Sequence, residues 1–175
     1  MDLFDAIALR QSVRKYTEQQ VAQDDIDKIV AAGCAAPVGM GAFKSMRIAV
    51  IQDPDFLERL NKAGAQAMGR PDSEMSVFHK APTLIAIFHE EPRMPGIDFA
   101  NAACVVENMA LAAAALGLGS VYLFMPNGAF ASDPSLAADL GIPEGFKAVS
   151  HLAVGHPADQ LEQRDVGLRI EVVQK

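Results

Sequence analysis

The sequence predicts an α+β fold. Helical and strand patterns are mixed along the 175 residues, and two helices precede the first strand. The regular strand–helix–strand alternation that builds a doubly wound parallel sheet is missing at the start of the chain. Since a domain usually has about 100–200 residues, a single domain over residues 1–175 is expected.

In the first half of the chain, periodicity and breakers define each element. Early acids and spaced apolar residues predict a short helix over 2–9, which ends in the basic run RQSVRKYT. A second helix opens at Asp24, and the proline and glycines of AAPVGMGAFKS end it in a loop. The remaining elements are strand 46–52 (MRIAVIQ), a helix from Asp53-Pro54 to about residue 67, and strand 82–88 (PTLIAIF), whose unbroken apolar run is typical of burial on both faces.

The second half is predicted around a long helix over 98–116, whose alanines permit close packing. Its inward face is expected to contain Phe99, Ala102, Ala103, Val106, Met109, Ala110, Ala113 and Leu116. Strand 119–124, a short helix over 133–140 and a core strand over 148–154 follow. The tail segment RIEVVQ has strand character but no evident neighbour in its own chain, so we expect it to pair with another copy.

Composition excludes some classes of function. With 22 acidic and 15 basic residues the net charge is −7, whereas nucleic-acid binding and binding to anionic lipid both need concentrated positive charge. The N-terminus lacks the basic and long apolar regions of a signal peptide, so a cytoplasmic location is expected. Residues 109–125 are nearly uncharged but contain helix-breaking glycines, and they predict a buried helix and strand instead of a membrane span.

Cysteine and histidine patterns give little indication of a site. Cys34 and Cys104 match no CxxC or zinc spacing, and both are expected to be small buried residues. The histidines lack metal-ligand spacing, so no metal site is predicted. The serines lie in no nucleophile motif, and the GxG at Gly117 and Gly119 follows a helix, the reverse of a dinucleotide fingerprint.

The basic run near the N-terminus is the best candidate for a binding site. Arg10 and Arg14 are four residues apart with Ser12 between them, so a helix end or tight turn could direct two guanidinium groups and a hydroxyl at one phosphate. The alternative is a solvated helix C-terminus, where basic side chains are favoured by the helix dipole. These residues alone leave both interpretations open.

Five segments together resemble the FMN-dependent nitroreductase family, in the same order and spacing. They are RQSVRKYT, DDIDKIVAAGCAAPVGMG, KAPTLIAIF, NMALAAAALGLGSVYL and LGIPEGFKAVSHLAVGHP. The likeness covers nearly the whole chain and is greatest to the small single-domain members. It implies a central, mainly antiparallel sheet flanked by helices, in a homodimer whose C-terminal segments are exchanged and whose two interface clefts each hold one FMN.

The resemblance also implies site residues. Arg10, Ser12 and Arg14 match the segment that holds the FMN phosphate and ribityl chain. Pro37, Val38 and Gly39 match a loop that the partner subunit lays against the isoalloxazine ring. The strand end at Tyr122 and Leu123 matches the backbone that faces the ring edge and N5. Arg164 matches a basic residue that returns to the phosphate, with Arg169 as the alternative.

The implied activity is an NAD(P)H:acceptor oxidoreductase that reduces nitroaromatics, quinones or flavins by ping-pong hydride transfer, with the flavin and no protein side chain as the catalytic group. A specialised flavin reaction on the same fold, such as dehalogenation, azoline oxidation or flavin destruction, is one alternative. A non-catalytic flavin-binding protein is another, because the chain departs from the family pattern. Val38 and Gly41 replace the usual Ser and Asn, and AFKSM replaces R-Q-P-W.

A stacking lid over the flavin is a further open point, because the chain contains no Trp. The phenylalanines available for a lid are Phe43, Phe78, Phe124 and Phe130. From sequence alone each of them is expected in the core.

Overall fold

The computed structural model describes residues 1–71, 75–167 and 169–175. At its centre lies a sheet with the strand order β1-β2-β4-β3. The strands are β1 (Met46–Ile51), β2 (Thr83–Glu90), β3 (Gly119–Leu123) and β4 (Phe146–Gly155). All three neighbouring pairs are antiparallel, which confirms the α+β class.

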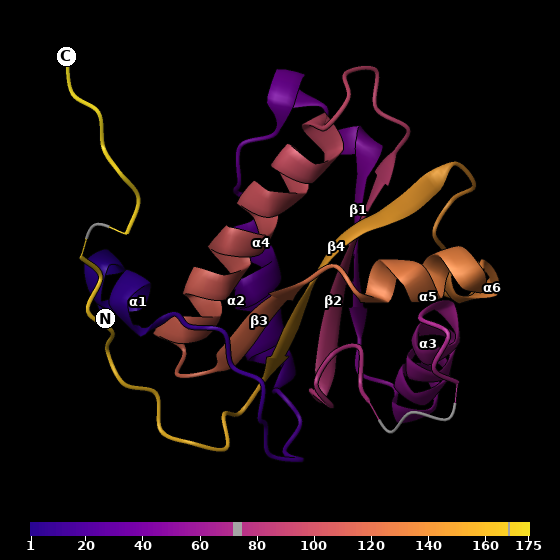
Figure 1. Ribbon diagram of the computed structural model, residues 1–175, viewed down its shortest axis with the longest axis horizontal. Coiled ribbons are helices and arrows are strands. Elements are labelled where there is room, and N and C mark those ends of the chain that lie inside the picture. The colour runs from indigo at the N-terminus through magenta and orange to yellow at the C-terminus, as the bar shows by residue number, and fades with distance from the viewer. Residues whose placement is uncertain (72–74, 168) are drawn as a thin grey trace.

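Helices cover both faces of this sheet (Figure 1). On one face lie α2 (Gln23–Cys34) and α4 (Ile97–Ala115), and on the other lie α3 (Pro54–Ala67), α5 (Pro126–Ser132) and α6 (Ser135–Asp139). The short helix α1 (Leu3–Leu9) packs against α4. The chain therefore forms three layers, with the sheet in the middle.

Two apolar cores explain this arrangement, one on each face of the sheet. Ile29, Ile85 and Met109 belong to the first core and are fully buried. Leu60 and Phe88 lie at the centre of the second. Because β2 contributes to both cores, its residues 83–89 are all buried, as the run PTLIAIF predicts. Each fully buried Leu, Ile, Phe or Met side chain in these cores contributes about 1.5–3 kcal/mol to the free energy of folding.

The predicted inward face of α4 is partly wrong. Phe99 is 47% exposed, and Ala103 and Leu116 are only partly buried, whereas Val105 and Asn101 are buried. The reason is that α4 contacts α2 as well as β2, β3 and β4, so its buried surface is wider than one stripe and is rotated away from Phe99. By length and composition α4 alone among the described helices could cross a membrane, and here it is a core helix of the fold.

The prediction that both cysteines are buried is also wrong. Cys34 and Cys104 are exposed free thiols. Cys34 is the last residue of α2, after the buried Gly33, and Cys104 precedes the buried pair Val105 and Val106 on α4. Each cysteine is therefore exposed although it adjoins buried residues of its helix.

Two features near the C-terminus differ from expectation. α5 occupies residues 126–132, where no helix is predicted, and the expected helix over 133–140 is shortened to Ser135–Asp139. Residues 169–175 form no strand and extend away from the body of the subunit (Figure 1). Their pairing with another copy stays a prediction.

Candidate functional site

The segment that follows α1 is fixed to the end of the sheet by backbone contacts. Ser12 forms a parallel bridge with Ser120 of β3, and the Val13 N–H donates to the Ser120 carbonyl at 2.9 Å. A Cβ on Gly119 would lie 2.8 Å from Val13 Cγ1, so only glycine allows the segment to approach this closely. Ser12 and its neighbours are therefore held at the outer edge of β3.

The same segment is held a second time at the end of β4. A Cβ on Gly155 would lie 2.9 Å from the Tyr16 ring, and the Thr17 N–H donates to the His156 carbonyl at 2.9 Å. The Tyr16 hydroxyl donates to the Val13 carbonyl at 2.7 Å, and burial raises the pKa of this phenol. The position of residues 12–17 is thus set by two adjacent strands.

Arg10 lies among charges from three parts of the chain. Its Nε is 3.6 Å from Glu107 Oε1 on α4. Partial desolvation, and then the charges of Arg10 and Arg169, lower the pKa of Arg164, while Glu107 raises it. Arg164 therefore lies within electrostatic reach of two other guanidinium groups and of the Glu107 carboxylate, and such a group of cations favours binding of an anion.

Arg164 is also the residue that attaches the tail to α1. Its guanidinium donates to the carbonyls of Ala8 (Nε, 3.3 Å) and Ile7 (Nη2, 3.0 Å), and its own N–H donates to Ala8 at 3.0 Å. Arg164 and Arg169 line a common cavity of about 320 Å³. The structure thus brings both candidate tail arginines close to Arg10.

Arg14 and Ser12 line a second cavity, of about 240 Å³, beside the segment that follows α1. The neighbour of Arg14 is His79, which sequence reasoning did not select. Burial lowers the pKa of His79, and the Arg14 guanidinium lowers it further. His79 and Lys80 both have left-handed backbone, with φ of 58° and 54°. Residues with strained backbone occur at functional sites more often than elsewhere. No glycine in the sequence indicated a left-handed backbone at these two positions.

The outer edge of β3 is open beyond Ser120. Because the Ser120 carbonyl faces the 12–13 segment and backbone groups alternate in direction along a strand, the N–H and C=O of Tyr122 face the same edge. In the described part of the chain, no strand pairs with β3 there. Tyr122 therefore offers backbone groups at the open edge, whereas the N–H and C=O of Leu123 face β4, where Leu123 pairs with His151.

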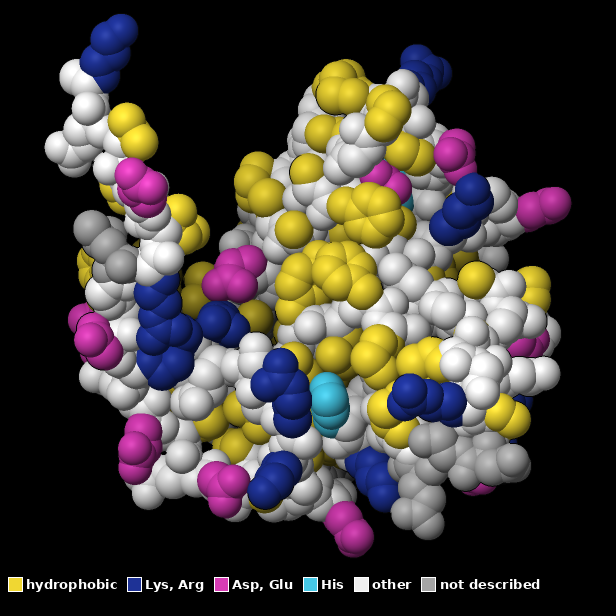
Figure 2. All heavy atoms as spheres, viewed as in Figure 1, with side chains coloured by type: hydrophobic (Ala, Val, Ile, Leu, Met, Phe, Trp, Pro, Cys, Tyr) yellow, Lys and Arg dark blue, Asp and Glu magenta, His cyan; other side chains and the backbone are white. Residues whose placement is uncertain are grey.

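Aromatic side chains form a surface beside this edge. The rings of Tyr122 and Phe124 are 5.0 Å apart, and the ring of Phe99 is 6.2 Å from that of Phe124. All three are at least one-third exposed. Figure 2 shows hydrophobic side chains gathered in the middle of this face, with basic side chains below them and to the left. Of the four lid candidates, Phe124 and Phe43 are exposed, so a core position is wrong for both, whereas Phe78 and Phe130 are buried as expected.

The loop containing Pro37, Val38 and Gly39 contacts a different part of α4 from the part that Arg10 contacts. Gly39 contacts Asn101 in the first half of α4, through a hydrogen bond of 2.9 Å. Arg10 contacts Glu107, six residues further along the helix and therefore about 9 Å along its axis. No hydrogen bond or ion pair described for this subunit joins the loop to the arginines.

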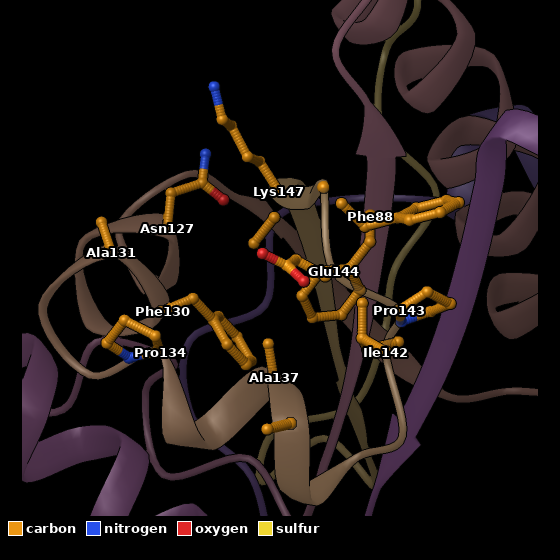
Figure 3. A pocket seen from close by; sticks show the side chains of 14 residues that line it. Phe88, Asn127, Phe130, Ala131, Pro134, Ala137, Ile142, Pro143, Glu144 and Lys147 are labelled. Carbon is orange, nitrogen blue, oxygen red and sulfur yellow. The ribbon is translucent and has the colours of Figure 1, made fainter.

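A separate cavity of about 610 Å³ lies between α5, α6 and the start of β4 (Figure 3). Its described lining is mainly apolar and includes none of the residues predicted for the site. Among the residues that the structure describes, no cluster of His, Cys, Asp or Glu could hold a metal ion.

Two proteins of known name are similar to this chain in sequence. A putative NADH dehydrogenase/NAD(P)H nitroreductase of Archaeoglobus fulgidus is 29% identical over 88% of this chain and 84% of its own. An FMN reductase [NAD(P)H] of Bacillus subtilis is 29% identical over 85% of this chain and 63% of its own.

The fold is also that of a solved enzyme. The crystal structure of a nitroreductase with bound FMN from Bacteroides fragilis superposes with a TM-score of 0.85, at 29% identity, over 99% of this chain and 100% of that one. The model of the nitroreductase family matches residues 7–156. The chain therefore belongs to the nitroreductase family.

Proposed function

We propose that this chain is an FMN-dependent NAD(P)H:acceptor oxidoreductase that reduces nitroaromatic, quinone or flavin acceptors. The observation that carries the proposal is the surplus of positive charge at Arg10, Arg164 and Arg169, next to the open edge of β3. An anionic group and a flat ring with polar edges can be bound there together. The relative that crystallised with FMN and the relative that is an FMN reductase support this choice.

The residues present fit FMN in charge and shape. Guanidinium groups bind phosphate through paired, charge-assisted hydrogen bonds, and Arg10, Ser12, Arg14 and Arg164 would hold the phosphate and ribityl chain. The backbone of Tyr122, next to Leu123 at the end of β3, would meet the polar edge of the ring. When bound, FMN supplies hydride and electron transfer at its ring, which protein side chains alone cannot perform.

The role of this chain in catalysis is then to orient the reacting partners and to exclude water from them. The exposed rings of Phe124 and Phe99 would cover the reacting partners, and backbone N–H groups at the β3 edge would stabilise negative charge on the ring. We assign no side chain as a catalytic acid or base, so the acceptor's protons come from water or from substrate.

We further infer a homodimer, in which Pro37, Val38 and Gly39 of each subunit lie against the ring bound by the other. The tail supports this inference, because Ile170 and Val173 are 82% and 86% exposed in the single subunit. Exchange of residues 166–175 between subunits would bury them. A single domain over residues 1–175 and a cytoplasmic location belong to the same proposal.

The first experiment is an absorbance spectrum of the purified protein before and after addition of NADPH. A yellow protein that bleaches is expected, and heat should release FMN and not FAD. A yellow protein that NADPH does not bleach would favour a specialised flavin reaction or a non-catalytic flavin-binding protein. A colourless protein that takes up no added FMN would contradict the proposal.

The second experiment is steady-state kinetics with NADPH and a quinone or nitroaromatic. If nicotinamide leaves before the acceptor enters the same cleft, double-reciprocal plots are parallel, whereas intersecting lines mean that both substrates are bound at once. Changing His79, His89, His151 or His156 to Gln should leave the rate within about tenfold, because loss of a general acid or base usually costs about 10²–10⁴-fold. A thousandfold loss with FMN still bound would favour the specialised reaction.

A further inference from the structure

The loop over residues 37–45 has few side chains that can attach it to the rest of the fold. From Pro37 to Phe43 its sequence is PVGMGAF, which offers no side-chain hydrogen-bond donor. Its own hydrogen bonds are local backbone turns, from the Gly41 N–H to the Val38 carbonyl at 2.9 Å and from the Ala42 N–H to the Gly39 carbonyl at 3.2 Å. Met40 and Gly41 have left-handed backbone, with φ of 57° and 63°, a conformation that is strained for methionine. The position of these turns on the subunit must therefore be fixed by groups outside them.

Asn101 of α4 provides that contact. The residue is 4% exposed, and its Oδ1 accepts a hydrogen bond from the Gly39 N–H at 2.9 Å. One helical turn earlier, the side chain of Ile97 leaves no room for a Cβ on Gly39, because that atom would lie 2.8 Å from Ile97 Cδ1. Gly39 is thus seated on α4 by one buried hydrogen bond and by close packing.

His89 at the end of β2 determines which way the Asn101 amide points. The His89 Nδ1 is 2.6 Å from the Glu90 carbonyl, which can only accept, so Nδ1 is assigned the proton. In the neutral ring Nε2 is then an acceptor, and it lies 3.4 Å from Asn101 Nδ2. With its NH₂ group facing His89, the amide must turn Oδ1 toward Gly39.

The same imidazole also lies beside the far end of the loop. The Ser45 hydroxyl donates its proton to the Ala42 carbonyl at 2.6 Å, so its Oγ, which is 3.4 Å from His89 Nε2, contacts the ring without donating to it. His89 is 4% exposed, so these contacts are shielded from water. The loop is therefore hydrogen-bonded to the buried pair His89 and Asn101 at Gly39 and packs against it at Ser45.

We propose that Asn101 is a positioning residue for flavin binding, which acts by fixing the backbone of Gly39, and that His89 orients its amide. The inference rests on the proposed function, in which this loop lies against the ring bound by the partner subunit. Asn101 itself does not touch the ring in this arrangement. It supplies the order that the side chains of PVGMGAF cannot supply.

The test compares three variants of the FMN-loaded protein. Asn101→Leu removes both hydrogen bonds at similar volume. Asn101→Asp keeps an acceptor for the Gly39 N–H and places a second oxygen, in place of the NH₂ group, beside His89. The matched control is Asn108→Leu on the same helix, which loses a bond of 3.1 Å to the Ala32 carbonyl and does not contact the loop. The readouts are FMN affinity, the circular dichroism of the bound flavin near 450 nm, and amide hydrogen exchange of the loop.

We expect Asn101→Leu to speed exchange of residues 37–45, change the flavin dichroism and raise the FMN Kd about tenfold, the size of one lost buried hydrogen bond. Asn101→Asp should restore all three readouts to near wild type, and Asn108→Leu should leave them unchanged. A merely structural role for Asn101 would lower the melting temperature without changing the dichroism.

Unchanged exchange in Asn101→Leu would overturn the inference, and so would faster exchange with unchanged FMN affinity and dichroism. If the wild-type protein binds no FMN, the proposed function is wrong, and so is the role of Asn101 in flavin binding. Amide hydrogen exchange would still show whether Asn101 holds the loop. If Asn101→Leu does not fold, Asn101→Ala removes the same two hydrogen bonds without adding a branched side chain, and the same outcomes apply.

Discussion

Arg164 donates a hydrogen bond from Nη2 to the carbonyl of Ile7 at 3.0 Å, although the two residues are at opposite ends of the chain. The last turn of α1 contains no basic residue of its own, so a side chain from the tail satisfies its free carbonyls. Arg10 is the C-cap residue of this helix. The tail therefore helps to place the residue that we propose for phosphate binding.

Arg10→Ala is expected to weaken FMN binding by about 1.5–3 kcal/mol, the size of a charge-assisted hydrogen bond. The melting temperature of the FMN-free protein should hardly change, because the Arg10–Glu107 pair is partly exposed and such pairs contribute little. Fluorescence titration with FMN measures the affinity. Arg59→Ala is the control, since Arg59 pairs with Asp139 on the other face of the sheet. A shift in stability with unchanged affinity would mean that Arg10 only caps α1.

Replacing the two tail arginines separately should identify the one that reaches the phosphate. Arg164→Ala is expected to lower both FMN affinity and the stability of the FMN-free protein, because it also removes the bonds to Ile7 and Ala8. Arg169→Ala should change stability little, since among the residues that the structure describes Arg169 bonds only the Asp165 carbonyl within the tail, at 2.8 Å. Titration and thermal melts of both variants test this. A larger loss of affinity in Arg169→Ala would reverse the assignment.

Gly119→Ala is expected to displace the 12–17 segment, because the new Cβ would lie 2.8 Å from Val13 Cγ1. Overpacking of this kind costs about 1–3 kcal/mol in the free energy of unfolding. FMN affinity should fall as well, since Ser12 and Arg14 move with Val13. Urea unfolding and FMN titration report the two effects. Normal affinity in a stable variant would show that the segment tolerates displacement.

Acid should destabilise the protein through His151. Burial lowers the pKa of this fully buried imidazole from 6.5 to about 3, so between these values the unfolded chain binds more protons than the folded one. The contribution of His151 to stability is therefore complete above pH 6.5 and is lost progressively as the pH falls toward 3. At pH 4.5 the loss is about 2–3 kcal/mol.

His151→Gln should remove this dependence on pH, because glutamine does not titrate and its amide can still donate to Asn127 Oδ1, which the imidazole contacts at 2.8 Å. The measurement is urea unfolding of both proteins at pH 7 and pH 4.5. An equal loss of stability in the two proteins would assign the acid sensitivity to carboxylates.

Deleting residues 166–175 is expected to loosen both the dimer and its bound flavin. An obligate dimer of this kind buries more than about 2,000 Å². Light scattering over a dilution series measures the mass, and the absorbance of the protein peak measures the retained FMN. A full-length protein that stays a folded monomer with its FMN would count against the exchanged tail.

Local pattern was sufficient to predict most of the sheet and its helices. The apolar run PTLIAIF predicts β2, and Asp53 with Pro54 marks the start of α3, where Asp53 accepts a bond from the Phe56 N–H at 2.7 Å. The segment at Pro126, Asn127 and Gly128 has the composition of a turn, which hid α5. Its helical form depends on packing against α3 and β4, and packing of this kind is not encoded in local sequence.

The site was predictable only where a motif is continuous. RQSVR predicts Arg10, Ser12 and Arg14 as a group, and only the family resemblance implies that a tail arginine approaches Arg10. Nothing in the sequence indicates that Arg14 lies beside His79. Those contacts join segments that are far apart in the chain. The left-handed backbone at His79 and Lys80 is likewise imposed by the surrounding fold, since neither residue prefers it.

The strand order has a consequence for the speed of folding. The central β2–β4 pair joins Thr83 to Val154, about 70 residues further along the chain, and α4 and β3 lie between them in the sequence. The entropy lost in closing so long a segment must be overcome before the pairing gains any contacts. Refolding is therefore expected on the millisecond-to-second scale, limited by this single ladder, while the helices themselves form in microseconds or less.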